Sequence, residues 1–141
     1  MSVLYPSWIE IPAADLARAL AFYRAVFGLI ETPIYDDEPP ARIAVLLASD
    51  KSSRNPGVSL VQSPLHTPCH GGPQVNFHVD THAALTHVLA QATTHGGSIV
   101  MPVAVIGDGV RYAVLRDCEG NTFAVSSYEP FTTDSSEREH A

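Results

Sequence analysis

The chain has 141 residues and a formal net charge of −7, which suits one domain and, without a cluster of basic residues, predicts no nucleic-acid partner. Hydrophobic residues make up 45% and charged residues 16%, a composition typical of a globular protein and not of a disordered one. No stretch approaches the ~20 apolar residues that a membrane span needs, so no membrane partner is expected.

The first half of the chain predicts one helix among four strands. Residues 8–11 alternate in polarity, which is typical of a strand. Asp15 is a suitable N-cap for a helix over 16–27, where apolar residues recur every three or four positions, and Gly28 suits its C-terminal end. Three further strands are expected at 29–35, 43–48 and 58–62.

The second half repeats this order after a connector over 63–73. A strand over 74–79 is followed by a helix that Thr81 caps and that ends at Gly96 and Gly97. The remaining strands are expected at 98–105, with an interruption at Pro102, and at 110–115 and 122–128.

The repeated order predicts an α+β fold of two βαβββ modules. Residues 1–130 form a single domain, in which module one covers 1–62 and module two covers 74–130. The polar residues 131–141 are expected to form a disordered tail.

Three ordered segments of this sequence resemble the vicinal-oxygen-chelate superfamily of glyoxalases, extradiol dioxygenases and bleomycin-resistance proteins. The segments are Ile9-Glu10-Ile11-Pro12 with Asp15-Leu16 and 22–28, then Val79-Asp80 with Gly96-Gly97, and finally Asp117-x-x-Gly120-Asn121-x-Phe123. The resemblance implies two modules with curved mixed sheets around a shared cleft and helices on the outer faces.

The same resemblance implies where a metal would bind. Metal-using members carry His, Gln or Glu at four positions. The first, third and fourth correspond here to Trp8, Gln74 and Ala124, and the second falls within 58–62, where only Gln62 could bind a metal. Trp8 and Ala124 cannot bind a metal, and two amides are a poor ligand set. We therefore expect no metal and no other cofactor.

Strand alternation places candidate ligand-binding residues on one face of each module. Trp8 and Glu10 share a face of the first strand, and Gln74, Asn76 and His78 share a face of the strand over 74–79. These faces either meet water, as in many antiparallel sheets, or line the cleft that the resemblance implies. The cleft would suit a small, partly apolar molecule with polar edges.

Glu10 is the candidate catalytic residue. A carboxylate inside a cleft would act as a general acid or base, but a salt bridge to Arg42 or Arg111 would explain the same residue without chemistry. Two interpretations also apply to His78, which is either an acid–base partner in the cleft or a wall residue held by hydrogen bonds. The segment 66–70 holds two histidines and a cysteine, yet with a proline inside it and no fourth ligand nearby we interpret it as a flexible linker.

Three functions follow from these residues and the resemblance. The first is binding of a small molecule in a metal-free cleft, as in bleomycin-resistance proteins. The second is a metal-free isomerase or lyase that uses Glu10, and the third is a metal-dependent enzyme of the lactoylglutathione-lyase type. The resemblance implies a homodimer, because chains of this length with two modules usually pair in the superfamily, and the helix over 82–95 carries no formal charge to repel a partner.

Two features bear on location. Residues 1–6 have neither the basic start nor the apolar stretch of a secretory signal. Cys69 and Cys118 are too few for a disulfide framework, and free thiols are typical of a reducing compartment. We therefore expect a cytoplasmic protein.

Overall fold

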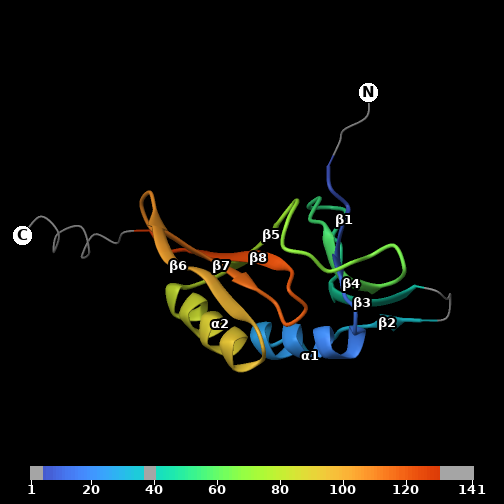
Figure 1. Cartoon of the computed structure of the whole chain (residues 1–141). Coiled ribbons are helices and arrows are strands. Elements are labelled where there is room, and N and C mark those ends of the chain that lie inside the picture. Colours follow the sequence, from blue (N-terminus) through green and yellow to red (C-terminus); the bar gives the residue numbers. More distant parts are fainter. Residues whose placement is uncertain (1–4, 37–40, 131–141) are drawn as a thin grey trace, which may run out of the picture.

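The computed structural model describes residues 5–36 and 41–130, which form two four-stranded sheets with one helix each (Figure 1). The first module contains β1 (Trp8–Pro12), α1 (Leu16–Phe27), β2 (Ile34–Tyr35), β3 (Arg42–Leu47) and β4 (Gly57–Gln62). The second contains β5 (Val75–Val79), α2 (His82–Thr94), β6 (Ser98–Ile106), β7 (Val110–Arg116) and β8 (Thr122–Tyr128). The expected tail over 131–141 lies outside the described residues.

The two sheets have the same topology. Their strand orders are β1-β4-β3-β2 and β5-β8-β7-β6, and in each the first and last strands of the module pair in parallel while the other pairs are antiparallel. The prediction of an α+β fold with two βαβββ modules is therefore confirmed. Both sheets are open, and no helix in the described residues is long and apolar enough to span a membrane.

The predicted helix ends are confirmed by their capping bonds. The Asp15 carboxylate accepts a hydrogen bond from the Arg18 N–H at 3.1 Å, and Gly28 ends α1 with a left-handed φ of 67°. In the second module the Thr81 hydroxyl accepts from the Ala84 N–H at 3.0 Å. Both caps satisfy backbone donors that a first helical turn leaves free.

Two strand predictions were wrong in extent. The strand expected over 29–35 is reduced to β2, which pairs only Ile34 and Tyr35 with β3. Pro33, which precedes β2, has no N–H to extend the ladder. The strand expected to break at Pro102 instead runs on as β6, because β6 is an edge strand and its pairing with β7 shifts register around the proline.

An aromatic cluster joins the two modules. Helix α1 contributes Tyr23 and Phe27, and the second sheet contributes Phe77 and Phe123, with ring centroids 4.9–6.3 Å apart. The two helices contact each other on the same side of the molecule (Figure 1). The core is therefore continuous across the repeat, which fixes the first sheet relative to the second.

The Asp117-x-x-Gly120-Asn121 motif has a structural role. The buried Asp117 carboxylate accepts hydrogen bonds from the Tyr23 hydroxyl at 2.7 Å and from the Asn121 amide at 3.0 Å. Asn121 also donates to the Pro12 carbonyl at 2.8 Å. The turn between β7 and β8 is thus tied to α1 and β1 of the other module. Burial, together with the Asp117 charge, raises the pKa of Tyr23 well above its ordinary value.

Candidate functional site

The face of the first sheet that turns away from α1 carries a cavity, which we call the sheet-one pocket. Trp8 and Glu10 lie on this face, as the alternation predicts, and pair in register with Gly57 and Ser59. The pocket has a volume of about 540 Å³. Its lining residues are Trp8, Glu10, Pro33, Tyr35, Ile43, Val45, Ala48, Ser49 and Ser59. The volume falls within the range of small-molecule sites, and the walls are mostly apolar.

Trp8 owes its position to a glycine on the neighbouring strand. A Cβ added at Gly57 would overlap Cζ3 of the indole, so the ring lies directly over the Gly57 backbone. The side chain remains 48% exposed. An aromatic plane held against a sheet and half open to solvent offers a surface on which a ligand can stack.

Glu10 forms a hydrogen bond with a residue of the connector. Its Oε1 lies 3.1 Å from Nε2 of His66, whose Nδ1 lies 2.6 Å from the Ser63 hydroxyl. An ionised carboxylate only accepts hydrogen bonds, so Nε2 carries the hydrogen, and Nδ1 of a neutral His66 accepts from Ser63. The Glu10 side chain is 50% exposed and that of His66 24% exposed. The three side chains form a hydrogen-bonded chain beside the sheet-one pocket.

This arrangement corrects two expectations. Glu10 is paired with His66 and not with Arg42 or Arg111, and Arg42 lies 3.9 Å from Asp36 instead. The start of the connector is not a free linker, because Ser63 and His66 form a β-bridge and the imidazole reaches β1. Sequence reasoning missed His66, because a contact over 56 positions follows from the path of the connector and from no spacing rule.

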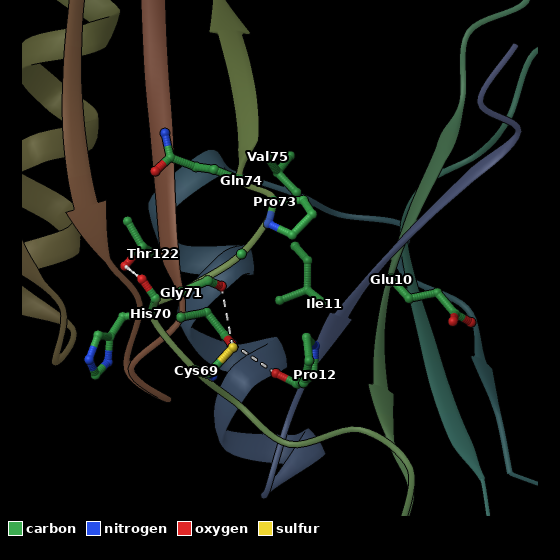
Figure 2. A pocket seen from close by; sticks show the side chains of 12 residues that line it. Glu10, Ile11, Pro12, Cys69, His70, Gly71, Pro73, Gln74, Val75 and Thr122 are labelled. Atoms are coloured by element: carbon green, nitrogen blue, oxygen red, sulfur yellow. Dashed lines mark hydrogen bonds between the residues drawn. The ribbon is translucent and has the colours of Figure 1, made fainter.

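The other predicted ligand-binding residues lie on the second sheet. Gln74, Asn76 and His78 are all exposed, and the Asn76 amide oxygen accepts a hydrogen bond from the Ser126 hydroxyl at 3.2 Å. Gln74 shares a small cavity of about 90 Å³ with Glu10, next to the connector (Figure 2). In that view the Glu10 carboxylate points away from Gln74.

In the part of the chain that the structure describes, the predicted site residues do not all line one cavity. Trp8 and Glu10 share the sheet-one pocket, whereas His78 lines a different cavity beside α1 and β5. Asn76 lines none of the cavities found in the part of the chain that the structure describes.

The four positions that correspond to metal ligands do not fit a divalent ion. The Trp8 indole occupies the first, and Ala124, with no donor atom and 1% exposure, occupies the fourth. The amide oxygen of Gln62 is already bound to the Leu16 N–H at 2.7 Å, which leaves only Gln74 free. Within residues 5–36 and 41–130, no group of three His, Cys, Asp or Glu side chains is placed to hold a metal.

A family model described as Glyoxalase/Bleomycin resistance protein/Dioxygenase superfamily matches residues 6–125, which include both helices and all strands except the end of β8. The chain belongs to this superfamily. The match spans most of the chain and confirms the resemblance that the three sequence segments carry. No curated protein matches the chain.

Solved structures of other superfamily members share this fold at low sequence identity. A glyoxalase/bleomycin resistance protein/dioxygenase family enzyme from Burkholderia phytofirmans PsJN is 20% identical, with a TM-score of 0.65 over 89% of this chain and 100% of that one. A glyoxalase/bleomycin resistance protein from Albidiferax ferrireducens T118 is 18% identical, with a TM-score of 0.64 over 87% and 98%. A glyoxalase-related enzyme from Fulvimarina pelagi is 13% identical, with a TM-score of 0.67 over 94% and 95%. At these identities the likeness establishes the superfamily fold alone.

Proposed function

We propose that this member of the superfamily binds a small, partly apolar molecule in the sheet-one pocket without a metal. The observation that carries the proposal is the Trp8 indole, which lies over Gly57 at one of the positions that correspond to metal ligands. The indole supplies a stacking surface there, and Glu10 supplies a polar edge beside it. Gln74, Asn76 and His78 of the second sheet lie outside this pocket, and we propose that they reach the ligand from the second sheet of a partner copy in the homodimer.

The test begins with the ligand. Native mass spectrometry of the purified protein, followed by release and identification of any retained small molecule, supplies the candidate. Because Trp8 is the only tryptophan, a ligand in the sheet-one pocket should quench or shift the protein's tryptophan emission saturably. Emission that stays constant during a titration that calorimetry shows to be binding would contradict the proposal.

A second candidate function is a metal-free isomerase or lyase in which Glu10 is the general base. The contact between Glu10 and His66 favours it, because a positioned carboxylate with an imidazole partner can accept a proton from a substrate and share it through a hydrogen bond. Glu10→Gln keeps the size of the side chain and removes the base. Loss of turnover with retained binding would establish catalysis, whereas a change in affinity alone would favour the binding protein.

The third candidate, a metal-dependent enzyme of the lactoylglutathione-lyase type, conflicts with the residues at the corresponding positions, so no reaction step is derived through a metal. Elemental analysis that finds one equivalent of zinc, nickel or iron per chain would overturn this choice. A cytoplasmic location and the absence of nucleic-acid and membrane partners remain predictions from composition.

A further inference from the structure

We propose a second binding site, separate from the sheet-one pocket, that takes a hydrophobic amine in its cationic form. The site is a cavity of about 560 Å³ where the two modules meet, and we call it the junction pocket. The residues that carry the argument are Tyr23, Phe27, Leu46, Phe77, Val79 and Asp80. No described residue lines both the junction pocket and the sheet-one pocket, so this inference goes beyond the proposed function. His78 lines the junction pocket and is also proposed to contact the ligand of the sheet-one pocket.

The wall of the junction pocket is aromatic. Tyr23 and Phe27 are stacked with an interplanar angle of 11° and centroids 6.1 Å apart, and Phe77 lies 4.9 Å from Phe27. Tyr23 is only 1% exposed and its hydroxyl is bound to Asp117, so the accessible part of this wall comes from Phe27 and Phe77. Aromatic faces carry partial negative charge and attract a cation that lies within about 6 Å of the ring centre.

The only formal charge on this pocket is negative. No lysine or arginine lines it, and Asp80 is the only Asp, Glu, Lys or Arg of the sequence between Asn55 and Gly107. None of the ion pairs among the described residues includes Asp80, and its side chain is exposed. A ligand that buries an apolar body here therefore meets a carboxylate at the edge.

The neighbouring helix does not use this carboxylate. Asp80 precedes α2, where an acidic side chain often serves the first turn. Here Thr81 accepts the hydrogen bond from the Ala84 N–H, and Glu129 accepts the one from the His82 N–H. With these two donors satisfied by other residues, Asp80 remains available to a ligand.

These features select one class of ligand. The apolar walls need an aromatic or aliphatic body, and the aromatic faces and Asp80 both favour a positive charge. Among the described residues of the lining, no lysine or arginine is present to pair with a carboxylate, and His78 is the one histidine. A primary amine attached to a bicyclic ring has this chemistry and is small enough for the volume.

Three probes of the same shape test the proposal: 2-naphthylmethylamine, 2-naphthylmethanol and 2-naphthoate. By calorimetry at neutral pH and low salt, the amine should bind two- to fivefold more tightly than the alcohol, the advantage expected of an exposed ion pair, and the naphthoate most weakly. Asp80→Asn should lower the affinity for the amine to that for the alcohol. Asp108→Asn, which removes an exposed carboxylate of the β6–β7 turn, is the matched control and should change neither affinity.

A blocking variant tests the location. Ala84 lines the junction pocket from α2, and Ala84→Leu keeps a good helix former while filling the cavity. It should weaken amine binding at least tenfold without lowering the melting temperature, whereas Trp8→Ala should leave amine binding intact. Two results with the wild-type protein would overturn the proposal: equal affinity for amine and alcohol, or no amine binding at millimolar concentration. Full amine binding to the Ala84→Leu protein, or lost amine binding to the Trp8→Ala protein, would overturn it as well. The Trp8→Ala result separates its failure from that of the sheet-one pocket.

Discussion

Trp8 and Gly57 show how one backbone position prepares a surface for a ligand. The indole can lie against β4 only because residue 57 has no Cβ. A large aromatic side chain usually appears in such a fold as part of the core, yet this one is half exposed on the side away from α1. At the scale of single residues, the sheet-one pocket therefore depends on the contact of the Trp8 ring with the backbone of Gly57, which has no side chain.

Gly57→Ala should displace the Trp8 ring, because the new methyl group would overlap it. The expected result is a shift of tryptophan emission and a weaker affinity for a ligand of the sheet-one pocket. Ala48→Gly, which changes another lining residue outside the strands, is the control. Unchanged emission of the Gly57→Ala protein would mean that the indole does not lie over β4.

Trp8→Ala should lower the free energy of unfolding by about 1.5–2.5 kcal/mol, since roughly half of the residue is already in water. A fully buried tryptophan would cost about 3–5 kcal/mol on truncation. Urea unfolding followed by circular dichroism measures the difference. A loss in the larger range would place Trp8 in the core and remove it from the binding site.

The pair formed by Glu10 and His66 should contribute little to stability. Both side chains are partly exposed, so a double-mutant cycle of Glu10→Gln and His66→Asn should give a coupling energy below about 1 kcal/mol. The same variants should alter ligand affinity or turnover. A coupling energy above about 2 kcal/mol in urea unfolding, with unchanged ligand affinity, would make the pair a structural tie.

At the scale of elements, the turn between β7 and β8 holds the modules together. Asp117 and Asn121 of this turn are buried and bonded to Tyr23 of α1 and to the end of β1. A buried carboxylate that loses a donor keeps its desolvation cost. The turn is thus more sensitive to substitution than its place between two strands indicates.

Tyr23→Phe should lower the free energy of unfolding by about 1–3 kcal/mol near neutral pH, because Asp117 loses a hydrogen-bond donor. Tyr128→Phe, at an exposed tyrosine, should change it little. The pKa of Tyr23 is raised in the folded protein, so its contribution is complete below about pH 10 and decreases at higher pH, where the unfolded chain ionises first. The stability difference between wild type and Tyr23→Phe should therefore shrink above pH 10 in urea titrations.

The two cysteines should differ in reactivity. Burial, with Asp117 and Glu119 nearby, raises the pKa of Cys118 to about 11, and the thiolate is the nucleophile. Cys69 is exposed on the connector. At pH 8, iodoacetamide should modify Cys69 well before Cys118, as measured by mass spectrometry of the peptides. Modification of Cys118 first would contradict the burial of the β7–β8 turn.

At the scale of the whole molecule, the open faces of the two sheets carry the predicted ligand-binding residues, but no described cavity contains both Trp8 and His78. The homodimer expected from the sequence remains a proposal. It provides a way to bring the first sheet of one copy to the second sheet of its partner. It also agrees with α2, which carries no formal charge.

Sedimentation at tens of micromolar concentration should show a dimer, and a monomer would contradict this proposal. A mixing experiment tests whether the site lies between copies. If it does, Trp8→Ala and His78→Ala proteins that each bind ligand poorly should regain part of the wild-type binding when unfolded and refolded together, because a mixed dimer contains one intact site. If the site lies within one chain, the mixture should bind no better than its components.

The amino-acid sequence by itself determined where both helices begin and which side chains of a strand share a face. Asp15 and Thr81 cap the helices as predicted, and the alternation of β1 places Trp8 and Glu10 on one face, since capping and strand periodicity depend on neighbouring residues. The repeated element order was also enough to predict two modules.

Only the tertiary structure decided which distant groups meet. The contact of Glu10 with His66, the position of Trp8 over Gly57 and the cavity beside Asp80 each join residues from different elements. Such contacts depend on the path of the connector and on how α1 packs against both sheets, and neither leaves a periodic signal in the chain. For this reason the sequence identified the fold and the faces, while the partners within each pocket came from the packing.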